Sequence, residues 1–448
     1  MTASAKRPVE AALRKARRIA SRVPNRVWMS AGTLLFAVVG TVLLVNSHAA
    51  TPTASYETEM GILSGNASSI SDAGASGGAG IKFSGTAQAL TCNLNATTAN
   101  FAAQVSAATA GQVVCLATGN YGTWTGTNKA ITVTAAAGAT PTMNINFGSG
   151  ANGFTLDRMS NMGGVIKDAT NVRIQNSTFT SPINVNGGTS TRGIVISHNN
   201  FLWTPPTSEP SNAKIILNET ATPTTGTVTN PAVTVEYNDV QNGDLDGVHI
   251  GGGAGMIVRN NRFMNLCDVG VNHTDNIQFE GATATLISGN YMYASQSCGT
   301  QGLTSFDSDT VGVIFENNVV DIPRDWGIEI YADKDSIVRH NTVVYHASPY
   351  SVFGHATGNI LFRNKDADPP GTGTHAYDNV GFVDFVAPTT GIEDHNTDPS
   401  KVTYVGGANP TTHDGFLLKA GSVGKGAASD GTDTGIYAIG NVTYGPLP

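Results

Sequence analysis

A short pattern of apolar and polar positions returns at intervals along the middle of the chain. It reads apolar, any residue, apolar, two polar residues, Asn, any residue, apolar. The five clearest copies are VTVEYNDV, MIVRNNRF, TLISGNYM, VIFENNVV and SIVRHNTV, which contain Asn238, Asn261, Asn290, Asn318 and Asn341. These Asn residues are 23 to 29 residues apart, the apolar positions alternate as in a strand, and no helical pattern separates the copies. The repeat predicts a parallel β-helix in which each copy belongs to one coil.

The recurring Asn has a structural explanation. Coils of a β-helix stack about 4.8 Å apart, so equivalent side chains form columns along the axis. An inward Asn at a tight turn tolerates left-handed backbone, and its amide can bond the coils above and below. Weaker copies extend the column through Asn199, Ser177 and Asn364. We therefore assign these residues to the scaffold and not to chemistry.

The amino-terminal residues differ in composition from the rest. Residues 1–26 contain eight Lys or Arg and one Glu, and an apolar run follows from Val27 to Val45. A basic flank before such a run predicts a transmembrane anchor or a signal segment over 27–50, and the small residues around Ala49 resemble a signal-peptidase site. We expect a linker over 51–97 and a β-helix domain over 98–440, either secreted or anchored to the outer face of the cell membrane.

Charge and cysteine content fit an exported protein. Only 13% of the 448 residues are charged, and without residues 1–26 the chain has 17 basic and 32 acidic residues, a net charge of −15. This balance excludes nucleic acid as an expected partner, and an anionic polymer would need a bridging cation. The four cysteines lack metal-ligand spacing, and we expect disulfides joining Cys92 to Cys115 and Cys267 to Cys298, with free thiols as the alternative.

Three segments resemble known families. FAAQVSAATAGQVVCLATGNYGTW, which follows Asn100, resembles the amino-terminal cap and first coil of the pectate-lyase-like right-handed β-helix superfamily. DGFLLKAGSVGKGAASDGTDTGIY is similar to the closing segment of secreted β-helix proteins, including polysaccharide lyases related to chondroitinase B. The resemblance implies an all-β, right-handed parallel β-helix with a capping helix. The stretch between Tyr56 and Phe83 resembles the opening strands of a carbohydrate-binding module, and is a relic, an added strand pair or a linker.

Polar residues concentrate in the second strand of the central coils. Aligning DLDGVHI, HTDNIQF, TQGLTSFD and RDWGIEI on their coils predicts two columns. One column contains Asp246, Asp275, Gln301 or Gly302, and Trp326, and the other contains His249, Gln278, Thr304 and Glu329. The Ile, Val and Leu between them face the core, so these polar side chains are expected to point outward. HTDNIQ also resembles a phrase of secreted β-helix proteins of presumed carbohydrate activity, with Asn276 in place of its Gly.

Two reactions fit these columns. A lyase would hold a calcium ion between Asp246 and Asp275 to neutralise a uronate carboxylate, and Arg324 or His273 would remove the proton or stabilise the enolate. A hydrolase would use carboxylates about 5 Å apart on adjacent coils or about 10 Å apart two coils away. The catalytic candidates are Asp246, His249, His273, Asp275, Arg324 and Glu329. The substrate-binding candidates are Gln278, Trp326 and Tyr331, and the metal-ligand candidates are Asp244, Asp246, Asp275 and Asp307.

The sequence thus predicts a monomeric, exported β-helix protein that binds and cleaves a polysaccharide, with a lyase favoured over a hydrolase. A non-catalytic glycan-binding surface protein is the competing class, because stacked Asp residues also terminate coil turns and Trp326 could be an ordinary coil residue. The Pro- and Thr-rich stretch from Trp203 to Thr229 is expected to leave the coil and form a wall beside a groove.

Overall fold

The computed structural model describes residues 67–71, 79–83, 90–204, 213–218, 223–267, 274–305, 309–324, 326–347, 357–364 and 369–447. The chain divides into two compact units, Met1–Gln88 and Ala89–Pro448. In the first unit, β1 (Ala67–Ser71) and β2 (Ala79–Phe83) pair as antiparallel strands. The predicted basic region and membrane or signal segment lie outside the described residues. Within the described ranges, no helix is long and apolar enough to span a membrane.

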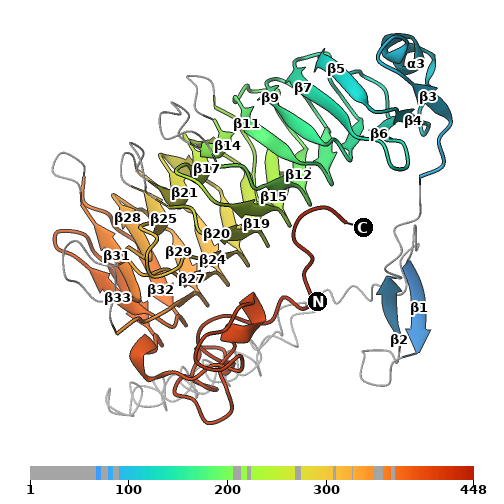
Figure 1. The fold of residues 1–448 in the computed structure, drawn as a ribbon. Coiled ribbons are helices and arrows are strands. Elements are labelled where there is room, and N and C mark those ends of the chain that lie inside the picture. Colours follow the sequence, from blue (N-terminus) through green and yellow to red (C-terminus); the bar gives the residue numbers. More distant parts are fainter. Residues whose placement is uncertain are drawn as a thin grey trace, which may run out of the picture. The chain divides into compact units, whose positions relative to one another are not determined.

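The second unit is a parallel β-helix, which confirms the prediction from the repeat (Figure 1). Successive coils contribute strands to three parallel sheets. Sheet 1 consists of β3 (Leu94–Ala96), β4 (Val113–Leu116), β6 (Thr132–Ala135), β8 (Thr155–Asp157), β10 (Arg173–Gln175), β12 (Ile194–Ser197), β15 (Val233–Glu236), β19 (Met256–Arg259), β23 (Leu286–Ser288), β26 (Ile314–Glu316), β29 (Ile337–Arg339), β32 (Thr374–Tyr377) and β34 (Gly391–Asp394). Sheet 2 consists of β5 (Gly119–Trp124), β7 (Pro141–Phe147), β9 (Asn161–Ile166), β11 (Phe179–Val185), β14 (Ala213–Leu217), β17 (Asp246–Ile250), β21 (Asp275–Phe279), β25 (Gln301–Ser305), β28 (Ile328–Tyr331), β31 (Asn359–Arg363) and β33 (Phe382–Phe385). Sheet 3 consists of β13 (Asn200–Phe201), β16 (Asp239–Gln241), β20 (Arg262–Met264), β24 (Tyr291–Tyr293), β27 (Val319–Asp321) and β30 (Thr342–Val343). A further short pair joins β18 (Gly253–Ala254) to β22 (Ala282–Thr283).

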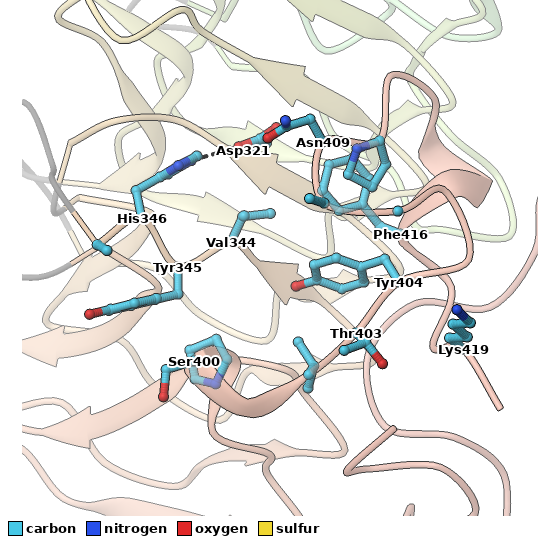
Figure 2. Close-up of a pocket in the computed structure, with 16 residues that line it drawn as sticks. Asp321, Val344, Tyr345, His346, Ser400, Thr403, Tyr404, Asn409, Phe416 and Lys419 are labelled. Carbon is cyan, nitrogen blue, oxygen red and sulfur yellow. Dashed lines mark hydrogen bonds and ion pairs between the residues drawn. The ribbon is translucent and has the colours of Figure 1, made fainter. Parts of the chain in front are cut away.

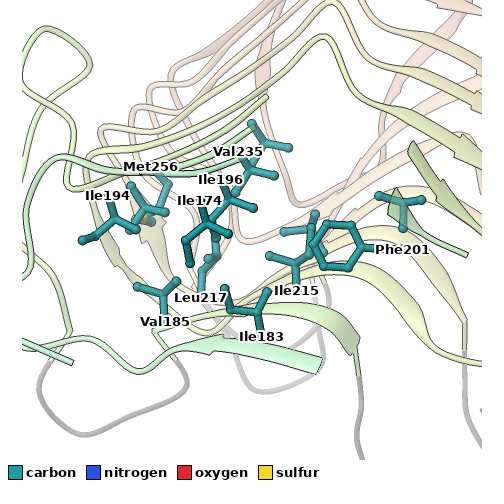
Figure 3. Packing of buried hydrophobic residues seen from close by; sticks show 14 of the residues in the cluster. Ile174, Ile183, Val185, Ile194, Ile196, Phe201, Ile215, Leu217, Val235 and Met256 are labelled. Carbon is teal, nitrogen blue, oxygen red and sulfur yellow. The ribbon is translucent and has the colours of Figure 1, made fainter. Parts of the chain in front are cut away.

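The core is a stack of aliphatic and aromatic side chains between the sheets (Figure 3). On sheet 1, Ile174, Ile196 and Val235 occupy equivalent positions of consecutive strands, and on sheet 2 Ile183 and Ile215 do the same. All five are fully buried. Burying one such side chain contributes roughly 1.5–3 kcal/mol, so each coil is stabilised mainly by the apolar residues that alternate along its strands.

An unbroken ladder of Asn side chains runs along the bend between sheets 1 and 3. Its members are Asn199, Asn238, Asn261, Asn290, Asn318, Asn341, Asn379 and Asn396. Each side-chain amide except the last donates to Oδ1 of the next Asn at 2.9–3.1 Å, and the main-chain N–H of the same residue donates to that oxygen as well. Ser177 begins the series, since its N–H donates to Oδ1 of Asn199 at 3.0 Å. The predicted structural column is therefore confirmed.

Two details of that prediction are wrong. The left-handed backbone belongs to the residue before the ladder Asn, as at His198 (φ 54°), Tyr237 (φ 57°) and Asn317 (φ 59°), and not to the Asn itself. The left-handed residue turns the chain, and this turn allows the following side chain to enter the interior. Asn364 is not in the ladder either, because it follows β31 of sheet 2. The ladder position of that coil belongs to Asn379.

The amino-terminal end of the β-helix carries a short helix, α3 (Phe101–Ala107), at the place where the sequence predicts one. Phe101 and Val105 are its buried residues. The ring of Phe101 meets Tyr121 and Trp124 edge to face, with centroids 5.2 and 5.6 Å apart. These contacts attach the helix to β5, and a role as the cap of the solenoid stays a prediction.

The disulfide prediction is confirmed, whereas part of the stretch predicted to leave the coil over 203–229 lies within it, and the wall stays a prediction. Cys92 pairs with Cys115 and Cys267 with Cys298. The Pro- and Thr-rich stretch contains β14 (Ala213–Leu217), which lies in sheet 2 between β11 and β17. Its apolar residues complete a regular coil there, so the stretch is not one continuous excursion. Residues 205–212 and 219–222 lie outside the described part.

Candidate functional site

The two polar columns predicted on sheet 2 exist in the predicted register. His249 pairs with Gln278, Gln278 with Thr304, and Thr304 with Glu329 across β17, β21, β25 and β28. The neighbouring Val248 lies in the apolar core, so the alternation of the strand turns His249 away from it. The spacing in the sequence was sufficient to predict these pairs, because the side chains of each strand alternate with a two-residue period.

The second column joins Asp246, Asp275 and Gln301. Asp275 pairs with Gln301, and the main-chain N–H of Asp275 donates to Oδ1 of Asp246 at 2.8 Å. The hydroxyl of Thr304 donates to Oδ1 of Asp275, which links the two columns. Asp244 stands beside them, because the hydroxyl of Thr274 donates to its Oδ1 at 3.1 Å. The two aspartates of adjacent coils are thus stacked as predicted.

The columns are not the open surface strip that the alternation suggested. Asp246 is 1% exposed, His249 is 4% exposed, and Asp275, Thr304 and Glu329 are fully buried. The period of a strand separates the core side of a sheet from the outer side, but it carries no information on what later packs against the outer side. The polar residues therefore form a buried cluster on the outer face of sheet 2.

Burial sets the electrostatics of this cluster. His249 lies between two carboxylates, with Nδ1 3.6 Å from Oδ2 of Asp246 and Nε2 3.7 Å from Oε1 of Glu280. Burial raises the pKa of Asp246; the charge of Asp275 adds to the rise, and hydrogen bonding from His249 opposes it. A carboxyl group in such surroundings retains its proton at a higher pH than an exposed one. Asp246 and His249 are consequently placed to exchange a proton.

Half-buried residues lie at the far end of the columns, next to β25, β28 and β31. The guanidinium of Arg324 lies over the ring of Trp326, 5.7 Å from its centroid, on the turn that leads into β28. A Cβ at Gly299 would lie 3.0 Å from Nη2 of Arg324, so this glycine leaves room for the arginine just before β25. Nε of Arg363 contacts Oε1 of Glu329 at 2.7 Å. This rim presents a cation next to an aromatic face.

The remaining candidates divide into two groups. Gln278 is half-buried beside His249, and Tyr331 is half-buried in register with Arg363 on β31. His273 and Asp307 lie outside the described residues. Glu280 and Arg363 belong to the site but were missed, because their partners come from other coils and only the register reveals them.

The predicted calcium ligands are described only in part, because Asp307 lies outside the described residues. Asp244, Asp246 and Asp275 do not bring three ligand oxygens within bonding range of one ion, whereas calcium takes six to eight oxygens. Within the described ranges, the one such group of acidic and His residues is Asp378, Asp394 and His395, far along the chain from the columns. Asp378 already accepts hydrogen bonds from the N–H and the hydroxyl of Ser429, each at 2.6 Å. With Asp307 undescribed, calcium stays a prediction.

A buried lysine near the site was also missed by the sequence analysis. The ammonium of Lys214 on β14 is fully buried and donates to the carbonyls of Phe201, Trp203 and Gln241 at 3.0, 2.7 and 2.5 Å. It also lies 4.5 Å from the centroid of the Trp203 ring. Burial lowers the pKa of Lys214 to about 7. The three carbonyls identify a structural cross-link between the end of sheet 3 and sheet 2.

Comparison with known proteins gives only distant similarities. No protein-family model matches the chain, and no curated protein sequence matches it. Among solved structures, pectate lyase Pel9A is similar with 13% identity and a TM-score of 0.41, covering 78% of this chain and 97% of that one. A mannuronic acid specific polysaccharide family 6 lyase from human gut microbiota has 10% identity and a TM-score of 0.31, covering 65% and 82%. The family 6 alginate lyase AlyGC has 12% identity and a TM-score of 0.31, covering 79% and 57%.

The parallel β-helix itself is established by the strand pairings of this chain. The chemistry has to be argued from its own residues.

Proposed function

We propose that this protein cleaves a uronate-containing polysaccharide by β-elimination at the cluster of Asp246, His249 and Asp275. The observation that carries the proposal is an acid and a base placed side by side, 3.6 Å apart, with the pKa of Asp246 raised by burial. Further along the same sheet, just before β28, Arg324 lies over Trp326, a pair suited to another unit of a charged glycan.

Each residue has a defined role in the step. Arg324 lies just before β28, three strands along the sheet from β17, and binds the carboxylate of another uronate unit of the same glycan. His249 takes the proton from the carbon that bears the carboxylate of the unit to be cleaved, and the C–H electron pair becomes a double bond as the adjacent carbon–oxygen bond breaks. Asp246 donates its proton to the departing glycosidic oxygen. Proton transfer from His249 to Asp246 then restores the starting state, and none of these transfers requires a metal ion.

The charges of the site are compatible with an anionic substrate despite its carboxylates. Asp246 is neutral when protonated, and Glu329 is paired with Arg363. Arg324 then supplies positive charge at the half-buried rim. Because the acid and the base are almost fully buried, the proposal requires the glycan to displace the groups that cover them.

Hydrolysis is the second candidate, and the stacking of Asp246 on Asp275 favours it. Carboxylates of adjacent coils lie about 5 Å apart, which is the separation used by retaining glycoside hydrolases. In this case Asp246 would protonate the leaving oxygen and Asp275 would attack the sugar. The pair formed by Asp275 and Glu329 is less suitable, since Glu329 is bound to Arg363.

The setting of this activity is also part of the proposal. We infer export through the amino-terminal segment, attachment to the outer face of the membrane or release from it, and action as a monomer. The assay also tests the predicted calcium dependence, although the proposed proton transfers do not need the ion.

The experiment incubates the purified full chain with uronate-containing and neutral polysaccharides, each with added calcium or with a chelator. The ultraviolet absorbance of unsaturated products and the number of new reducing ends are both recorded. Asp246→Asn and Arg324→Ala are compared with Asp384→Asn, which changes an exposed carboxylate on β33 of the same sheet.

β-Elimination predicts absorbance that falls about 100-fold or more in Asp246→Asn and stays unchanged in Asp384→Asn. Arg324→Ala should raise KM more for uronate polymers than for neutral ones. Reducing ends without absorbance would establish the hydrolase instead. Binding without any product would refute both reactions and favour a glycan-binding surface protein.

A further inference from the structure

A second candidate site lies on sheet 3, where the carboxy-terminal segment packs over the strands. Tyr404 and Phe416 contact each other edge to face with centroids 5.2 Å apart, and Phe416 packs against Tyr291 of β24 at 5.9 Å. A pocket of about 540 Å³ remains between this segment and the coil ends (Figure 2). Its lining includes η3 (Pro399–Lys401) on one side and Val344 on the other.

One wall of the pocket is polar and fixed in place. Nε2 of His346 lies 2.7 Å from Oδ1 of Asp321, and Nδ1 lies 3.3 Å from the side-chain amide of Gln296. Asp321 is 6% exposed, whereas His346 is half-buried and borders the pocket. Both ring nitrogens are thus engaged, which holds the imidazole and its carboxylate in a single orientation.

The hydroxyl of Tyr404 is the second, independent observation. Tyr404 is 9% exposed, and its buried Oη forms no hydrogen bond within the described ranges of the chain. In Figure 2 this hydroxyl points across the pocket toward Tyr345 and Val344. Burial and the nearby charge of Asp321 raise the pKa of Tyr404, so the group remains a protonated donor. A buried hydroxyl without a partner costs about 1–3 kcal/mol, which a bound oxygen atom would recover.

The pocket continues along the solenoid axis. A second cavity of about 330 Å³ shares Asp321, His346, Asn409 and Pro410 with the first. It extends to Tyr293 and Met264, which are in register with Asp321 on consecutive strands of sheet 3. Successive strands lie about 4.8 Å apart, so the two cavities form a groove parallel to the axis.

We propose that this groove, formed by the two cavities on sheet 3, binds a short stretch of neutral glycan. Sugar rings present apolar faces to Tyr345 and Tyr293, and their hydroxyls satisfy Tyr404 and the Asp321–His346 pair. A wholly apolar ligand would leave those polar groups unsatisfied. An anionic ligand would approach the carboxylate of Asp321, which the cation of Lys419 at the exposed edge offsets only in part.

This groove is separate from the cleavage site on sheet 2, and the inference does not depend on the proposed reaction. Its role is to hold a glycan chain while another part of that chain, or another molecule, is processed elsewhere. Binding can therefore be measured without turnover.

The test measures binding of cellotriose, mannotriose, xylotriose and trigalacturonate to the full chain by calorimetry. Tyr404→Phe removes only the unpartnered hydroxyl, and Tyr437→Phe is the matched control at a tyrosine that is 48% exposed. Tyr345→Ala removes an aromatic face, and Asp246→Asn disables the site on sheet 2.

At least one neutral trisaccharide should bind more tightly than trigalacturonate. Its affinity should fall about tenfold in Tyr404→Phe and stay unchanged in Tyr437→Phe and Asp246→Asn. Equal affinity of Tyr404→Phe and the parent protein would overturn the proposal, as would no binding of any neutral trisaccharide at millimolar concentration. A crystal structure with the neutral trisaccharide that binds most tightly, showing only water on the Tyr404 hydroxyl, would do the same. If the parent protein binds a neutral trisaccharide in this way but cleaves no polysaccharide, only the proposed function is refuted.

Discussion

Replacing Asn290 by Ala interrupts the Asn ladder at its middle. The side-chain amide of Asn290 donates to the carbonyl of Val258 at 2.9 Å and to Oδ1 of Asn318 at 3.0 Å. Its own Oδ1 accepts from the main-chain N–H and the side-chain amide of Asn261, both at 3.0 Å. The substitution therefore removes four hydrogen bonds between three coils at a position that water does not reach.

The expected cost follows from the groups left behind. The buried N–H of Asn261 loses its acceptor, at about 1–3 kcal/mol, and each of the other interrupted bonds contributes about 1 kcal/mol. The free energy of unfolding should consequently fall by about 4 to 6 kcal/mol. Asn396→Ala is the matched control, because Asn396 is the half-buried last member of the ladder. Removing this half-buried terminal side chain lets water reach its partners, so this change should cost only about 1 kcal/mol.

Urea denaturation of the two variants and the parent protein, followed by far-ultraviolet circular dichroism, measures these differences. The slope of the free energy of unfolding against urea concentration should be the same in all three proteins, since the surface exposed on unfolding hardly changes. If Asn290→Ala were no more destabilising than Asn396→Ala, the ladder would not be a source of stability, and its regular geometry would only follow from the packing of the coils.

Three further predictions use the same measurement. Because burial raises the pKa of Asp246 in the folded protein, the native state binds this proton more tightly than the unfolded chain, and the free energy of unfolding should decline as the pH rises from about 4 to about 8. Asp246→Asn should flatten this decline. The same decline in the variant and the parent protein would contradict the raised pKa. Lys214→Met should lower the free energy of unfolding by about 3 kcal/mol, since three carbonyls lose their donor, whereas Met at the exposed Lys167 should change it by less than about 0.5 kcal/mol. Replacing Cys267 and Cys298 together by Ser should lower the free energy of unfolding by about 4 kcal/mol, as expected for a separation of 31 residues. A decrease of less than about 1 kcal/mol would show that the unfolded chain is compact without the disulfide.

The register of the site could be predicted because it depends only on short-range regularities. The two-residue period of a strand and the position of the ladder Asn place His249 next to Gln278, and the structure agrees. The same reasoning failed for Asn364, because an apolar alternation followed by Asn also fits a strand of sheet 2. A local pattern identifies a strand but not the sheet to which it belongs.

Burial and long-range contacts could not be predicted in this way. Whether Asp246 is covered depends on segments from other coils, which no periodicity encodes. The environment of Lys214 could not be predicted either, since its hydrogen-bond acceptors come from three different positions along the chain. The groove on sheet 3 was missed entirely because residues such as Tyr404 belong to an irregular carboxy-terminal segment without a repeat.

Because of the ladder, the geometry of the scaffold does not depend on the number of residues in each coil. Consecutive ladder members are 39 residues apart between Asn199 and Asn238 but only 17 apart between Asn379 and Asn396, yet the hydrogen bonds that join each pair are alike. One side chain per coil thus keeps the register, and the intervening chain is free to grow or shrink. New surface can be inserted into any coil without disturbing its neighbours, which makes this protein a natural carrier for grafted loops.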